Sequence, residues 1–107
     1  MKKPSFLPAE RNIHFPNSTI QEFCRRYPVR ELSAFGSVLR SDFHKRSDID
    51  LLVEFKPRAQ VGFLTLSRME RELSRILERP VDLVPKRGLK SKIRKAILSN
   101  ARVLYAA

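Results

Sequence analysis

The sequence predicts an α/β (α+β) domain, in which helices flank a small mixed β-sheet. Three observations lead to this fold class. The chain has 107 residues, of which 42% are hydrophobic, enough for one core. Segments with the apolar spacing of a helix alternate with segments patterned as strands. Prolines and glycines separate these segments. Such alternation is typical of helices packed on a sheet.

Residues 1–16 contain three prolines and no sustained periodicity. We therefore expect them to form an extended N-terminal arm, with residues 17–107 as a single domain. Asn17 or Ser18 is expected to cap the first helix, which Pro28 ends. The apolar face of this helix would comprise Ile20, Phe23, Cys24 and Tyr27.

A strand is predicted at 30–36, followed by a short helical turn at 38–40 and a polar loop at 41–47. Residues 48–55 form the clearest strand pattern in the chain. Its apolar face consists of Ile49, Leu51, Val53 and Phe55. Because side chains alternate across a strand, the opposite face carries Asp48, Asp50 and Glu54.

The second half of the chain predicts two helices, each followed by a strand. The helix at 62–78 has a buried stripe of Leu66, Met69, Leu73, Ile76 and Leu77. Pro80 begins a short strand at 81–84. A basic helix at 89–100 is expected to point Leu89, Ile93, Ile97 and Leu98 inward. Residues 103–105 are predicted to form a final edge strand.

The composition favours a polyanionic ligand. There are 22 Lys and Arg residues against 11 acidic ones, giving a net charge of +11. The field of such a protein attracts nucleotides, nucleic acids or acidic proteins, and repels cationic substrates such as aminoglycosides. Cys24 is the only cysteine, which excludes an intramolecular disulfide. We see no signal peptide or membrane span and expect a cytoplasmic location.

Three aspartates carry the predicted chemistry. Asp48 and Asp50 are two residues apart and project from the same face of one strand. Asp82 lies on another short strand, between Val81 and Leu83. If the two strands pair, Asp82 can approach Asp48 or Asp50 to about 5 Å. Carboxylates that close repel one another unless a divalent cation lies among them, and hard oxygen ligands suit Mg²⁺.

The pair Gly36-Ser37 follows the first predicted strand. Glycine lets the backbone approach a phosphate closely. Ser37 begins a helical turn whose free N–H groups can bind anionic oxygens. By itself this pair is more often an ordinary turn, and a lone Asp-x-Asp is more often a solvated feature.

Together, however, these residues form a specific pattern. Gly36-Ser37, ten residues and Asp48-Ile-Asp50 resemble the signature of the DNA polymerase β-like nucleotidyltransferase superfamily. The surrounding strings Phe35-Gly-Ser-Val-Leu-Arg40 and Ser47-Asp-Ile-Asp-Leu-Leu-Val53 are similar to the minimal nucleotidyltransferase (MNT) family. Val81-Asp82-Leu83 matches its third acidic motif, and the resemblance runs from about residue 17 to 105.

The resemblance implies a polymerase β-like fold and a Mg²⁺-dependent transfer of AMP from ATP to a hydroxyl group, with two metal ions. Asp48, Asp50 and Asp82 would be both catalytic and metal-binding. Gly36, Ser37 and Arg40 would bind the nucleotide. Members are often antitoxins of HEPN-domain ribonuclease toxins, some of which they modify with AMP on a tyrosine.

Two alternatives remain from the sequence. The protein could silence a partner by binding alone, without catalysis. It could instead act on RNA through its basic surface. Two basic runs motivate the second alternative, namely Lys86, Arg87, Lys90, Lys92, Arg94 and Lys95, and the stripe Arg68, Arg71, Arg75 and Arg79. Such a run is more often a solvated helix face, and no aromatic residues are interleaved for base stacking.

Overall fold

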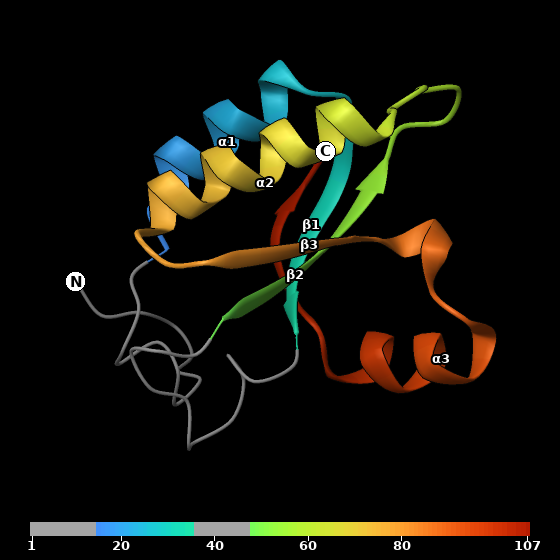
Figure 1. Cartoon of the computed structure of the whole chain (residues 1–107). Helices are drawn as coiled ribbons and strands as arrows, with labels where there is room; N and C mark the ends of the chain where they lie inside the picture. The colour runs from blue at the N-terminus through green and yellow to red at the C-terminus, as the bar shows by residue number, and fades with distance from the viewer. Residues whose placement is uncertain (1–14, 36–47) are drawn as a thin grey trace.

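A computed structural model describes residues 15–35 and 48–107. The described part forms a four-stranded mixed sheet with helices (Figure 1). The elements are α1 (Asn17–Arg26), β1 (Val29–Phe35), β2 (Ile49–Phe55), α2 (Phe63–Leu77), β3 (Val81–Pro85), the 3-10 turn η3 (Lys86–Gly88), α3 (Ser91–Asn100) and β4 (Arg102–Ala106). The predicted turn at 38–40, the loop at 41–47 and most of the predicted arm lie outside the described residues.

The strand order is β3-β2-β1-β4. β1 pairs antiparallel with both β2 and β4, whereas β2 pairs parallel with β3. Two parallel strands need a crossover connection, and α2 provides it. The mixed sheet confirms the predicted fold class, and β4 lies at an edge as predicted.

Helices α1 and α2 lie side by side on one face of the sheet (Figure 1). Ile49, Leu51 and Val53 of β2 are completely buried beneath them. The predicted stripe of α2 also faces this core, with Met69 and Leu73 fully buried. The core cluster further includes Phe15, Ile20, Phe23, Cys24, Val29, Leu32, Ala34, Leu77, Val81 and Leu83. Phe15 shows that the core includes a residue two positions before α1.

The start of α1 and the end of α2 differ slightly from the prediction. Pro16, not Asn17 or Ser18, precedes the first turn of α1, and no side chain caps this helix. The Pro16 carbonyl accepts a hydrogen bond from the Ile20 N–H at 2.9 Å, so the helix begins one residue earlier. Helix α2 ends at Leu77 because Glu78 adopts a left-handed conformation with φ 56°. Arg79 therefore lies beyond the helix and does not extend its arginine stripe.

The prediction that α3 buries its apolar side chains is wrong. No residue of α3 is buried, and Ile93 and Leu98 are 52% and 39% exposed. The physical reason is the surface available to this helix. Around Leu52, the face of the sheet opposite α1 and α2 carries Glu31, Ser33 and Glu54, so it offers little apolar surface to receive the helix. Among the described residues, no helix has the length and apolar character needed to cross a membrane.

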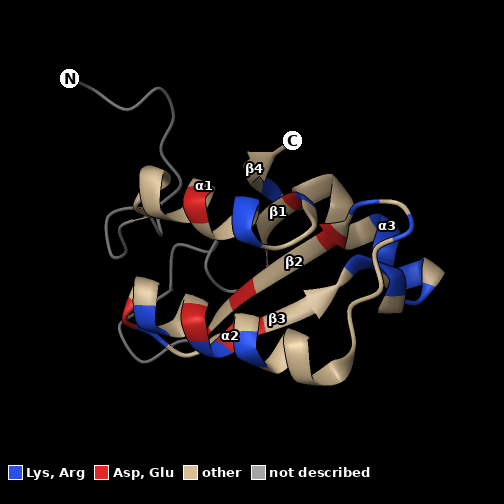
Figure 2. Ribbon diagram, turned by 90° about the horizontal axis from the view of Figure 1, so that it is seen from above, with Lys and Arg blue, Asp and Glu red and all other residues tan. Residues whose placement is uncertain are grey.

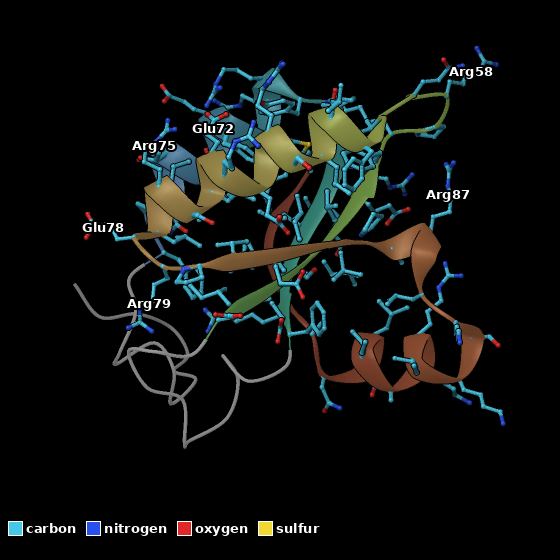
Figure 3. The ribbon with its side chains drawn as sticks, viewed as in Figure 1. Arg58, Glu72, Arg75, Glu78, Arg79 and Arg87 are labelled. Atoms are coloured by element: carbon cyan, nitrogen blue, oxygen red, sulfur yellow. The ribbon has the colours of Figure 1, made fainter. Side chains whose placement is uncertain are left out.

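A polar cluster joins α1 to α2 above the core. Tyr27 donates a 3.0 Å hydrogen bond from its hydroxyl to Glu72, and the Arg26 guanidinium forms an ion pair with the same carboxylate. Figure 3 labels Glu72 on α2, beside α1. The hydrogen bond from Arg26 is the main cause that lowers the pKa of Glu72. Burial, followed by the bond to Glu72, raises the pKa of Tyr27.

We expect Glu72 to contribute to stability in a pH-dependent way. Its pKa is lower in the folded than in the unfolded state, so the contribution is complete above the unfolded pKa of about 4.3. The contribution is lost as the pH falls through the pKa that Glu72 has in the folded state. Urea unfolding of wild type, Glu72→Gln and the exposed control Glu78→Gln should be compared at pH 7 and pH 3.5. The loss on acidification should be smaller only in Glu72→Gln, and equal losses in all three would contradict the assignment.

Candidate active site

The predicted acids lie on the face of the sheet that α1 and α2 leave open. Ile49 and Leu51 point into the core, so alternation places Asp48 and Asp50 on the opposite side. Val81 and Leu83 are likewise buried, at 7% and 4% exposure, and Asp82 between them is exposed. All three aspartates therefore belong to one face of the described sheet.

The pairing of β2 with β3 sets Asp50 beside Asp82. The two residues are direct Cα partners in the parallel register. Neighbouring strands lie about 4.8 Å apart, which brings the two carboxylates within reach of a shared ligand. A 2.9 Å hydrogen bond from the Ile49 N–H to the Pro80 carbonyl starts this pairing. The structure thus contains the strand pairing on which the approach of Asp82 to Asp50 depends.

Asp48 comes one residue before β2 and is exposed, whereas Asp50 is half-buried. Within residues 15–35 and 48–107, no three His, Cys, Asp or Glu side chains are gathered as a group that could hold a metal ion. Carboxylates repel one another at short range, and a cation supplies the attraction that brings them together. The metal site of three aspartates therefore stays a prediction.

The predicted phosphate-binding residues Gly36, Ser37 and Arg40 lie outside the described residues. The last described residue before them is Phe35, at the end of β1. Phe35 is the Cα partner of Asp50 across the sheet. β1 consequently ends beside the acidic pair, which agrees with the spacing of the sequence motif.

Two side chains of α2 hold the strand that carries Asp82. The Val81 N–H donates to the Ser74 hydroxyl oxygen at 3.0 Å, and the Leu83 N–H donates to the Glu70 carboxylate at 2.8 Å. β3 is an edge strand, so these outward N–H groups have no neighbouring strand to bond. Glu70 and Ser74 thus fix the backbone on both sides of Asp82.

Sequence reasoning missed this role of Glu70 and Ser74. The missed signal is positional: residues 70 and 74 are four apart and border the apolar stripe of α2. They therefore lie at the margin between the core and solvent, where an edge strand can be reached.

Two hollows lie farther along β2, and neither is lined by Asp50 or Asp82. Leu52, buried to 3% exposure, follows Asp50 on this face and lines the nearer hollow together with Ser33, Leu98 and Val103. The second hollow is lined by Phe55, Pro85, Arg87 and Arg94, among others. Glu54 and Lys86 line both hollows and form an ion pair of 3.0 Å.

The single thiol of the chain takes no part in this site. Cys24 belongs to α1 and is buried in the core, on the far side of the sheet from the acids. Burial raises its pKa to about 12, so the thiol is protonated at neutral pH. A protonated, buried thiol is a poor nucleophile.

Comparisons with known proteins agree with this arrangement. Residues 17–104 match the family model described as a nucleotidyltransferase domain. The chain is 38% identical over 78 residues to a protein adenylyltransferase MntA of Thermococcus cleftensis, covering 73% of this chain and 77% of that one.

Solved structures share the fold at lower identity. A crystal structure of a toxin-antitoxin with AMP-PNP superposes with a TM-score of 0.71 at 20% identity, over 87% of this chain and 75% of that one. A tri-AMPylated Shewanella oneidensis HEPN toxin in complex with an MNT antitoxin gives a TM-score of 0.63 at 19% identity, over 85% and 70%.

Loss of the Glu70 carboxylate should loosen β3. We expect Glu70→Ala to lower the free energy of unfolding by about 1–2 kcal/mol, because the Leu83 N–H loses its acceptor. Glu70→Gln keeps an oxygen acceptor and should lose less. Urea unfolding measures the stability, and amide hydrogen exchange should show faster exchange at Leu83 in Glu70→Ala. The exposed neighbour Arg71→Ala is the matched control, and an effect of the same size there would argue against the edge-strand role.

Proposed function

Because the chain belongs to the nucleotidyltransferase domain family, we propose that it transfers AMP from ATP to a hydroxyl group of a partner protein. We further propose that this partner is a HEPN-domain toxin, for which the chain is the antitoxin. The observation that carries the proposal is the register of β2 and β3, which sets Asp50 beside Asp82 on the open face of the sheet.

The comparisons support the substrate class. The relative from Thermococcus cleftensis is named as a protein adenylyltransferase. The donor of an adenylyl group is ATP. The two similar solved structures are toxin-antitoxin complexes, one with an ATP analogue and one with an AMP-modified HEPN toxin. A protein adenylyltransferase needs a protein acceptor, and the exposed Asp82 on the open face of the sheet is accessible to one.

Mg²⁺ fits the donor set of this face. Asp48, Asp50 and Asp82 offer only carboxylate oxygens, the ligands that Mg²⁺ prefers, and two of them are neighbours in register. These three residues would hold the ion or ions. Bound Mg²⁺ would neutralise the charge of the triphosphate and of the departing pyrophosphate.

The protein's own residues would then position the triphosphate and deprotonate the acceptor hydroxyl. The exposed Asp82 would accept the proton of the acceptor hydroxyl, whose oxygen forms a bond to the α-phosphorus while the bond to pyrophosphate breaks. Pyrophosphate leaves and AMP remains on the acceptor. Gly36 and Ser37 would hold the triphosphate, and Arg40 would contact a phosphate oxygen. Such transfers depend mainly on positioning and on charge stabilisation.

Asp50→Asn should abolish AMP transfer. Loss of a carboxylate that both binds the ion and orients the phosphates should lower the rate at least about a hundredfold. The measurement is transfer of label from α-labelled ATP to the purified partner toxin. Glu31→Gln, on the same face but outside the acidic pair, should keep near wild-type activity. Equal transfer by wild type and Asp50→Asn would refute catalysis by these acids.

The same variant separates catalysis from binding alone. If the protein acts by transfer, cells that express the toxin should not be rescued by Asp50→Asn. Full rescue by this variant, with the toxin unlabelled, would instead identify a non-catalytic antitoxin. Salt-sensitive modification of RNA rather than of the toxin would identify an enzyme that acts on RNA, since contacts between protein and phosphate weaken steeply with salt.

Asp82→Asn should weaken divalent-ion binding. Changes to groups that only orient metal ligands cost about 10- to 100-fold in affinity, so loss of a direct ligand should cost at least about tenfold. Mn²⁺, a spectroscopic substitute for Mg²⁺, can be titrated in the presence of a non-hydrolysable ATP analogue. Glu54→Gln is the control, because Glu54 is paired with Lys86. Unchanged Mn²⁺ affinity in Asp82→Asn would remove residue 82 from the metal site.

A further inference from the structure

Helix α3 is the least covered element of the described chain. Nine of its ten residues are exposed, and Ile97 is only half-buried. In Figure 1 it lies on the side of the sheet opposite α1 and α2, at the end where β3 passes into η3. A short helix so little packed gains little stability from its own fold, which suggests that another molecule covers it.

The charged residues in the segment that contains α3 have one sign. Residues 86–107 contain seven Lys and Arg residues and no Asp or Glu. Four of these cations lie on α3 or at its N-cap, namely Lys90, Lys92, Arg94 and Lys95. Figure 2 shows the corresponding blue segments gathered at α3, whereas red and blue alternate along α1 and α2. This surface therefore complements a negatively charged partner.

An apolar centre accompanies the charge. Ile93, Leu98 and Val103 are 52%, 39% and 49% exposed. Ile93 and Leu98 belong to α3, and Val103 belongs to β4, the edge strand that follows α3 and pairs with β1. Apolar side chains within a rim of charge are typical of protein interfaces. We name these three residues and the four cations of α3 the α3 surface.

The α3 surface is continuous with the acidic face. Leu98 and Val103 line the same hollow as Leu52, and Leu52 follows Asp50 on the open side of β2. Arg94 lines the second hollow, beside the pair of Glu54 and Lys86. A molecule seated on α3 would thus reach the edge of the site where AMP is transferred.

We infer that the α3 surface docks the protein acceptor of AMP, through a patch of that protein with carboxylates around an apolar centre. The inference rests on the proposed function for the identity of this partner, and it adds the surface and its chemistry. Docking there would bring the acceptor hydroxyl towards Asp50 and Asp82 without a second domain of this chain.

Two other occupants agree less well with the surface. RNA would satisfy the positive charge, but it would leave Ile93, Leu98 and Val103 without apolar contacts, and α3 carries no aromatic side chain for base stacking. A second copy of the chain also has a net charge of +11 and would be repelled. An acidic protein surface satisfies both the charge and the apolar centre.

The test uses two variants of the full chain. Lys92→Glu/Arg94→Glu/Lys95→Glu reverses three exposed charges, and Ile93→Ser removes an exposed apolar group. In steady-state AMP transfer to the HEPN toxin, the triple variant should raise the KM for the toxin at least tenfold. Ile93→Ser should raise it several-fold. Neither should change the KM for ATP by more than about twofold, because neither residue set contacts the aspartates.

The matched control is Arg25→Glu/Arg68→Glu/Arg71→Glu. It makes the same change in net charge on exposed positions of α1 and α2, across the sheet from α3. Its KM for the toxin should stay within about twofold of wild type. An equal rise in the control would show a general field effect and overturn the docking surface, as would an unchanged KM in the triple variant.

Binding separates this inference from the proposed function. Calorimetric titration of the toxin with each variant needs no catalysis. If wild type binds the toxin but transfers no AMP, and the triple variant alone loses binding, the docking surface stands and the enzymatic proposal fails. If transfer and toxin binding persist in the triple variant while affinity for a single-stranded RNA oligonucleotide is lost, α3 is a nucleic-acid surface and the inference is wrong.

Discussion

The parallel pairing of β2 with β3 is the constraint on which the site depends. Asp50 and Asp82 are 32 positions apart in the sequence, and only this register makes them neighbours. A parallel pair cannot be closed by a tight turn, so the fold must include α2 as a crossover. The same helix then supplies Glu70 and Ser74 to the edge of β3. One element thus connects the acidic strands and fixes the backbone around one of the acids.

The two faces of the sheet have opposite requirements. On one face, Ile49, Leu51 and Val53 are fully buried beneath α1 and α2 and supply the hydrophobic stabilisation. On the other, Asp50, Glu54 and Ser33 are unsuited to a packed helix, because buried carboxylates need partners or ions. The exposure of α3 follows from this division.

The sequence was most informative where periodicity reports burial. Alternation in residues 49–55 predicted both the strand and its acidic face, and the spacing of Met69 and Leu73 predicted the buried side of α2. Periodicity failed for α3, because apolar spacing does not reveal whether a receiving surface exists. The hydrogen bonds from Val81 and Leu83 to α2 could not be predicted, since they depend on how an edge strand meets a helix. The roles of Gly36, Ser37 and Arg40 remain predictions.

Charge connects the site with the rest of the molecule. Three carboxylates would repel a triphosphate, yet they lie in a chain of net charge +11. The surrounding cations raise the local concentration of polyanions, whereas a divalent ion, as proposed above, would reverse the sign of the site itself. The excess of cations is greatest in residues 86–107, beside the open face rather than within it. This arrangement places the basic α3 surface, which suits an acidic protein, beside the face that carries the aspartates.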